Sequence, residues 1–459
     1  MARLSSRLLA LLALPLCSNS LAQVAPKLTF SDRPLRVTLF DYPLNVTDGY
    51  YLTSMNQSLH VTKGIHQSVS GTQGRLLEED HPFWGKAITL LGTSVFNVVH
   101  AYLPTGLAWQ HQEAHRAILR YFGIHSYNMA YEARLFTMRV ATNQVSDEDL
   151  TNFKAEHPAD FNRNRGAGHE AQNDMMLAMK KDAFMYGTPG YRDIPAIFFN
   201  TFVIITYVRE YKKKDYDEKI DLRNQEEACC VEDRDIQGVE FTPWVYDLFL
   251  PDEPYYLRGN NGGVHPYDTA PTVDRYIGNE DLTPEMAKYL DKQAVLVFFT
   301  ALSPSLFGIT RFKSKSPFNG EPFWWNFSFR HDLQGFGHVV DFTAYLMQNQ
   351  WNLFVTMHNY KNKTNWFPGL DVQVMRYPLG TLFGTALVGM WLQPEDQSFT
   401  STKPKPGGQI QFRLDGPISQ KVSWLEWSVE TDMKTTGYAA GYVALDPMFE
   451  IRAGVNLRY

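Results

Sequence analysis

Residues 449–459 read FEIRAGVNLRY and end the chain. Apolar and polar side chains alternate along this stretch, with Phe449, Ile451, Ala453, Val455, Leu457 and Tyr459 separated by Glu450, Arg452, Asn456 and Arg458. Because successive side chains of a strand point to opposite faces, this pattern predicts a β-strand with one apolar and one polar face. The same alternation recurs from about residue 322 in segments such as HVVDFTAYLM, QIQFRLD and GYAAGYVAL. The last third of the chain is therefore predicted to be an antiparallel sheet of about eight or nine strands.

The first residues of the chain have the composition of a targeting segment. Two arginines precede an apolar run over residues 8–16, and small and polar residues follow as far as Ala22. This arrangement predicts a secretory signal peptide over residues 1–22 and an exported protein. Only Cys229 and Cys230 remain after its removal, so the fold is expected to depend on packing rather than on disulfides. The net charge of −6 gives no sign of a nucleic-acid partner.

Two architectures accommodate the C-terminal strands. One is a soluble antiparallel sandwich or barrel with its apolar face inward. The other is a barrel with its apolar face toward lipid, favoured by the export signal, by aromatic residues near strand ends and by the final aromatic residue. FEIRAGVNLRY resembles the last strand of bacterial outer-membrane β-barrels, in which the terminal aromatic residue belongs to the insertion signal. The resemblance implies a barrel over residues 312–459, surrounded by membrane lipid in a bacterial outer membrane. Bacterial barrels have even strand numbers, so a strand from the N-terminal segment is expected to complete the count.

The preceding residues divide into two parts. Residues 23–80 are predicted to be mainly extended, with a short strand at residues 35–40, and residues 81–311 show helical patterns. The predicted fold class is therefore α+β, a mainly helical N-terminal domain followed by an antiparallel β-barrel. The uncharged runs at residues 196–208 and 294–303 are too short to cross a bilayer, and polar residues interrupt residues 87–103. We expect these segments to be buried core helices.

Residues 108–119, AWQHQEAHRAIL, place two histidines four positions apart on a predicted helix. His111 and His115 then project from one face and can share a metal ion. A later helix contains GHEAQND, in which Glu170 and Asp174 are also four residues apart. Together the two helices resemble the zinc site of the gluzincin metallopeptidases. The resemblance implies zinc ligands at His111, His115 and Glu170, with Asp174 orienting a ligand histidine.

The general base of that family is missing. The resemblance requires a glutamate directly after the first histidine, where this chain has Gln112, and an amide cannot accept a proton from water. Glu113 points away from His115 on a helix and does not replace it. His125, His169 and Glu170 are the other candidates for taking the proton.

Three functions remain open at this point. The first is an exported outer-membrane protein whose helical domain is a zinc-dependent, peptidase-like hydrolase. The second is a non-catalytic barrel protein with a helical plug or binding domain, in which the histidine and acidic pairs are buried contacts between helices. The third is an enzyme acting on lipid, for which the chain offers no nucleophile motif.

Overall fold

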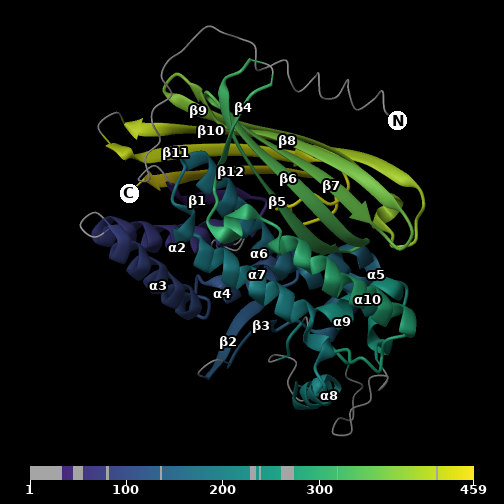
Figure 1. The fold of residues 1–459 in the computed structure, drawn as a ribbon. Helices are drawn as coiled ribbons and strands as arrows, with labels where there is room; N and C mark the ends of the chain where they lie inside the picture. Colours follow the sequence, from purple (N-terminus) through teal and green to yellow (C-terminus); the bar gives the residue numbers. More distant parts are fainter. Residues whose placement is uncertain are drawn as a thin grey trace.

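The computed structural model describes residues 34–44, 55–78, 82–134, 137–227, 234–236, 239–259, 273–317, 319–419 and 422–458. The predicted signal peptide, the two adjacent cysteines and the terminal tyrosine lie outside these residues. Within them the α+β class is confirmed: helices dominate the N-terminal part, and a large antiparallel, barrel-like sheet follows (Figure 1).

The sheet has ten strands in the order β1-β12-β11-β10-β9-β8-β7-β6-β5-β4. Strand β1 (Pro34–Tyr42) comes from the N-terminal segment and pairs antiparallel with β12, with Leu35 opposite Leu457. This pairing confirms the prediction of a strand at residues 35–40 that completes an even number. The GYAAGYVAL segment, predicted to be a strand, instead lies in the connection between β11 and β12. The other strands are β4 (Phe312–Lys315), β5 (Pro322–Gln334), β6 (Gly337–Gln348), β7 (Trp351–Lys361), β8 (Trp366–Leu379), β9 (Leu382–Pro394), β10 (Pro404–Ser419), β11 (Val422–Lys434) and β12 (Met448–Arg458).

The sheet exposes apolar side chains on its outer face, and its inner face buries most of its charged and polar side chains together with some aromatic ones, such as Tyr345 and Phe354. Neighbouring strands expose an outer apolar face that includes Val388 and Met390 of β9, Ile410 and Phe412 of β10, and Val429 and Met433 of β11. Asp415, Glu426 and Asp432 on the opposite face are buried. The predicted alternative, a soluble sandwich or barrel with its apolar face inward, is therefore wrong. The sheet is also open, because β1 and β4, its two edges, do not pair with each other among the described residues.

The helical body lies on the concave side of the sheet (Figure 1). Its elements are α2 (Met55–Glu78), α3 (Pro82–His100), α4 (Leu107–Tyr121), α5 (Asp147–Glu156), α6 (Pro158–Tyr186), α7 (Ile194–Val208), α8 (Tyr216–Glu227), α9 (Phe241–Phe249) and α10 (Pro284–Leu296), with short 3-10 helices η7 (Val297–Ala301) and η8 (Pro304–Phe307). A hairpin of β2 (Tyr127–Arg134) and β3 (Thr137–Asn143) interrupts the helices.

The prediction that residues 23–80 are mainly extended is wrong from residue 55 onward, where α2 forms. Its sequence contains several β-branched and polar residues, which have weak helix propensity. The helix packs against β1, α3, α4 and α6. Helices in proteins owe most of their stability to such tertiary packing, which local sequence does not reveal.

Helix α6 is the central element of the fold. Most of its side chains are buried, and it packs on β5 of the sheet, on α4 and on α9. Two glycines allow this close approach. A β-carbon at Gly166 would lie 2.8 Å from the carbonyl oxygen of Leu333 on β5, and one at Gly168 would lie 2.3 Å from His111 Nε2 on α4. The helix ends at Gly187, which has a positive φ of 64°.

The expectation of buried core helices is wrong for α3, for part of α7 and for part of residues 294–303, where Phe298 is 45% exposed and Leu302 is 52% exposed. On α3, Leu91 is 66% exposed and Val95 is 57% exposed, and on α7 the exposed fractions of Phe198 and Phe202 are similar. None of the helices in the described part of the chain has both the length and the apolar character needed to cross a membrane.

Candidate metal centre

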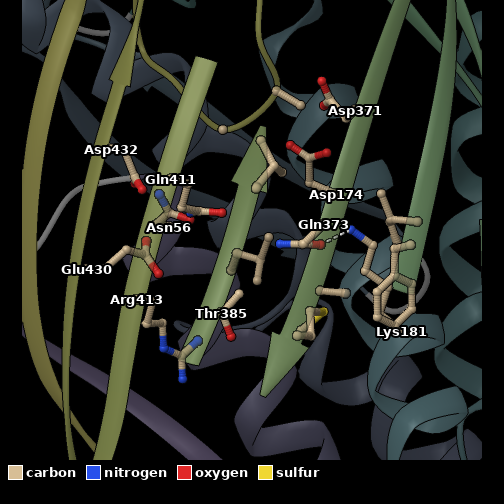
Figure 2. A pocket seen from close by; sticks show the side chains of 18 of the residues that line it. Asn56, Asp174, Lys181, Asp371, Gln373, Thr385, Gln411, Arg413, Glu430 and Asp432 are labelled. Carbon is tan, nitrogen blue, oxygen red and sulfur yellow. Dashed lines mark hydrogen bonds between the residues drawn. The ribbon is translucent and has the colours of Figure 1, made fainter. Parts of the chain in front are cut away.

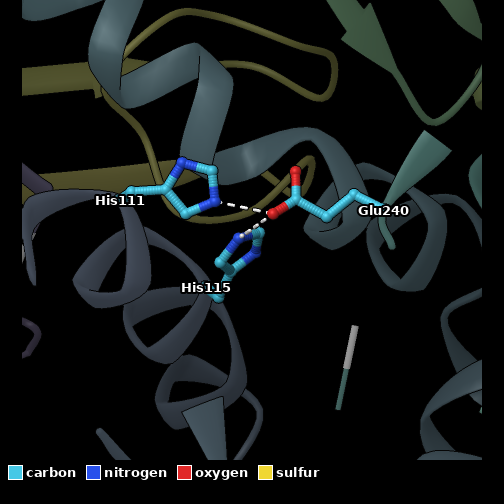
Figure 3. Close-up of side chains that lie close together, drawn as sticks. All are labelled: His111, His115 and Glu240. Carbon is cyan, nitrogen blue, oxygen red and sulfur yellow. Dashed lines mark hydrogen bonds and ion pairs between the residues drawn. The ribbon is translucent and has the colours of Figure 1, made fainter. Parts of the chain in front are cut away.

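Two histidines of α4 converge on a carboxylate that comes from the N-terminus of α9. His111 and His115 lie one turn apart, and Glu240 directly precedes α9 (Figure 3). Glu240 Oε1 lies 2.6 Å from His111 Nε2 and 3.3 Å from His115 Nε2. The three donor atoms all lie within 4.8 Å of one another, which suits ligands about 2 Å from a shared ion. His115 is completely buried and Glu240 is 2% exposed.

The hydrogen bond of His115 on its other ring nitrogen determines its tautomer. His115 Nδ1 lies 2.6 Å from the backbone carbonyl oxygen of Asn164. A carbonyl oxygen can only accept, so Nδ1 carries the proton and donates it. In the neutral ring, Nε2 therefore directs a lone pair toward the Glu240 carboxylate. This contact is favourable only if a cation, either a second proton or a metal ion, lies between the two atoms. A backbone carbonyl that fixes the ring in this way is also a common partner of metal-binding histidines.

The charges at the site favour an ionised carboxylate. Burial by itself would raise the pKa of Glu240, but the interactions with His111 and His115 are stronger and hold its pKa far below the ordinary value. Burial likewise opposes a charge on His111, yet the Glu240 carboxylate raises the pKa of His111 overall. Glu240 also stands at the positive end of the α9 dipole, which stabilises a negative charge.

A third histidine and a tyrosine lie beside this group. His169 Nδ1 is 3.2 Å from Glu240 Oε2, and the His169 ring stacks on Tyr207 with 5.2 Å between centroids. Burial, reinforced by the charges of His111 and His115, lowers the pKa of His169 to about 3 despite the nearby carboxylate. His169 is thus a neutral imidazole next to the candidate ligands.

Glu170 does not join this group. It lies on the adjacent helix, as predicted, but pairs with Arg163 at 2.9 Å, and both side chains are completely buried. Asp174 forms an ion pair with Arg330 of β5 instead of orienting a ligand histidine. The physical reason is the 100° step between consecutive helix residues. His169 and Gly168 face α4, so Glu170 and Asp174 are turned away from it. The carboxylate that lies beside His111 and His115 is therefore Glu240 and not the predicted Glu170.

Gln112 and Glu113 have structural roles. The Gln112 amide donates to the carbonyl of Val140 at 2.9 Å and accepts from the Thr142 hydroxyl at 2.8 Å, which ties α4 to the β2–β3 hairpin. Glu113 accepts hydrogen bonds from Arg116 and Asn128. Neither side chain is directed to the histidine pair, so neither replaces the missing base. His125 is exposed beyond the end of α4.

A polar cavity of about 270 Å³ lies between the inner face of the sheet and helices α2 and α6 (Figure 2). The charged side chains that line it largely pair with one another or with polar neighbours. Lys181 of α6 donates to Gln373 at 2.8 Å, and Arg452 of β12 binds Glu430 at 2.9 Å. The cavity therefore extends the polar interior of the sheet, and its lining does not define a particular ligand.

The chain was compared with protein-family models, curated proteins and solved structures, and none of them matches it.

Proposed function

We propose that this chain is a membrane-embedded metalloprotein that holds a zinc ion between His111, His115 and Glu240. The observation that carries the proposal is the fixed tautomer of His115, whose Nε2 lone pair faces a buried carboxylate oxygen at 3.3 Å. A divalent cation among the three donors satisfies both groups. Two imidazole nitrogens and one carboxylate oxygen are a donor set typical of zinc.

Metal analysis of the purified protein tests this proposal. The full chain is extracted in detergent, and its zinc content is measured by mass spectrometry for the wild type and His111→Ala. We expect about one zinc per chain in the wild type and little in the variant. His125→Ala is the matched control, because His125 is exposed outside the group. Equal zinc in all three proteins would refute a site at His111.

We also propose that the outer apolar face of the sheet contacts lipid in a bacterial outer membrane. Support comes from the arrangement of the strands, with exposed apolar side chains outside and buried charges inside, which is the alternation of membrane sheets. Extraction of a membrane fraction tests this. We expect the protein to resist high salt and to dissolve only with detergent, and release by salt alone would contradict the placement.

A metal-dependent hydrolase is the second candidate, and the number of ligands favours it. Three protein ligands leave one position open, as in catalytic zinc sites with two histidines and a glutamate. A zinc ion bound there would polarise a carbonyl group and an attacking water. His169 lies beside this group, and its buried Nε2 has no hydrogen-bond partner in the described part of the chain. Its pKa of about 3 makes it too weak a base to take a proton near neutral pH, so the ion itself would have to activate the water.

Hydrolysis of fluorogenic peptides and short-chain esters by the zinc-loaded protein tests this activity. His111→Ala should abolish turnover together with zinc binding, because His111 is one of the three proposed ligands. A zinc-loaded wild type without activity toward either class would favour the non-catalytic alternative, in which the site binds metal within a helical plug.

A further inference from the structure

The open sheet surrounds α6 only in part, and helices surround the rest of it. Beside one edge, α2 packs on β1, and α3 packs on α2. Beside the other edge, η7 and η8 pack on β5, and α7 packs on both of them. Helices α3 and α7 contact each other. These helix contacts therefore connect the two sides of the open sheet. Strands and helices together form a closed wall around α6.

The helical half of this wall has an exposed apolar surface. Its outward side chains repeat at helical spacing on α3 and α7 and continue on η7 and η8. We call this surface the helical apolar face, and it consists of Phe83, Trp84, Ile88, Leu91, Val95, Val99, Phe198, Phe202, Phe298, Leu302 and Phe307. Phe307 is 75% exposed. An exposed apolar surface of this extent marks an interaction site rather than a water-facing surface.

Charge is nearly absent from the segments that build it. No Asp, Glu, Lys or Arg occurs in residues 87–103, 194–208 or 294–310, although such residues make up 20% of the chain. Protein interfaces normally surround an apolar centre with a polar rim. Here the apolar surface continues from η7 onto β5 of the sheet, where the ring of Phe299 lies 5.9 Å from that of Phe329.

We propose that the helical apolar face contacts the acyl chains of the same bilayer as the sheet, so that strands and helices together form the lipid-facing wall. This inference rests on the proposed membrane placement of the sheet. The backbone groups of a helix are satisfied within the helix, and therefore helices can take the place of strands at a lipid boundary. They also pack on the edge strand β1 and on the part of β5 that β4 leaves unpaired, where unpaired backbone groups would be costly in hydrocarbon.

Fluorescence quenching by spin-labelled lipids tests the inference. The full chain, with Cys17, Cys229 and Cys230 replaced by serine, is reconstituted in liposomes and labelled at single cysteines with a fluorophore. The two test positions are Val95→Cys on α3 and Phe202→Cys on α7.

Phe412→Cys on β10 reports on the sheet, and Asp221→Cys on the exposed surface of α8 reports on water. We expect lipid quenching of at least twofold at positions 95, 202 and 412, and quenching by aqueous iodide only at position 221. If the label at position 202 disturbs folding, Phe298→Cys provides the same information from η7.

Quenching at position 412 without quenching at 95 and 202 would overturn the inference and leave the membrane placement of the sheet intact. Protection of 95 and 202 from both lipid and iodide would also overturn it, because a protein partner would then cover the face. Absence of lipid quenching at all positions, 412 included, would overturn the proposed placement of the sheet and the inference with it.

Discussion

Replacement of Glu240 by glutamine distinguishes the metal centre proposed from the structure from the one predicted by resemblance. Glutamine has the same shape but no charge, and it is a poor ligand for zinc. Glu240 contacts three imidazoles: His111 at 2.6 Å, His115 at 3.3 Å and His169 at 3.2 Å. Its loss would therefore remove one donor and the negative charge that would balance a bound ion.

The expected loss of zinc affinity follows from this geometry. Removing only a supporting partner of a ligand weakens metal binding by about 10- to 100-fold. Glu240 is itself a donor, so we expect Glu240→Gln to lose at least about 100-fold, which corresponds to about 2.7 kcal/mol. Zinc affinity is measured by competition with a chromophoric chelator, on detergent-solubilised protein.

Glu170→Gln is the matched control, because Glu170 is an equally buried carboxylate on the neighbouring helix. Its partner is Arg163, and both side chains are 0% exposed. Neutralising Glu170 leaves a buried guanidinium unpaired, which costs about 3 kcal/mol of folding stability. The thermal midpoint should fall while zinc affinity stays within about threefold of the wild type. Loss of zinc from Glu170→Gln together with retention by Glu240→Gln would refute the assignment.

Three further predictions concern the same centre. Gly168→Ala should displace His111, because the added carbon would lie 2.3 Å from Nε2, and zinc affinity in the chelator assay should fall at least about tenfold. Removing zinc with a chelator should lower the thermal midpoint, since an ion present at 100 times its dissociation constant stabilises the fold by about 2.7 kcal/mol; an unchanged midpoint would argue against binding. Without metal, the charged His111–Glu240 pair contributes fully below the unfolded His111 pKa of 6.5 and loses its contribution as the pH rises through the raised folded value. Because the pKa of Glu240 is lowered, its contribution is present above the unfolded value of 4.5 and is lost when the pH falls through the folded value. Zinc competes with protons for the same nitrogens, so the rise in thermal midpoint on adding zinc should be larger at pH 8 than at pH 5.5.

Most strands of the sheet could be predicted because their signal is local, although GYAAGYVAL was wrongly predicted to be a strand. Alternation along residues 449–457 assigns each side chain to a face without knowledge of the neighbouring strands. The alternation nevertheless allowed two predictions, a soluble sheet with its apolar face buried and a membrane barrel with its polar face buried. Only the packing of α2 and α6 against the polar face decided between them.

The candidate metal centre was only half predictable, because part of its signal is not local. His111 and His115 belong to one helix, so their spacing reveals a shared face. Glu240 is 125 residues from His115 and has no periodic relation to it. The only local signal was a carboxylate directly before a segment with Pro243 in its first turn, which marks a helix start. Nothing in that signal points toward α4.

The face that the sheet turns outward indicates whether water or lipid surrounds it. Complete burial of a large apolar side chain stabilises a protein by about 1.5–3 kcal/mol. Val388, Met390, Ile410, Phe412, Val429 and Met433 are each between 40% and 63% exposed. Leaving six such residues in water forgoes about 5–9 kcal/mol, which is comparable to the whole stability of many folded domains.

The opposite face adds to this argument. The sheet buries carboxylates such as Asp341 and Asp415, both 0% exposed, and compensates them with arginines. Burying charges in this way has a desolvation cost that ion pairing offsets only in part. A water-soluble sheet with the same alternation would avoid both the exposure of apolar side chains and the burial of charges by facing the helices with its apolar side. The observed orientation is the stable one when the outer phase is as apolar as the side chains that face it, and therefore it supports a lipid environment for the sheet.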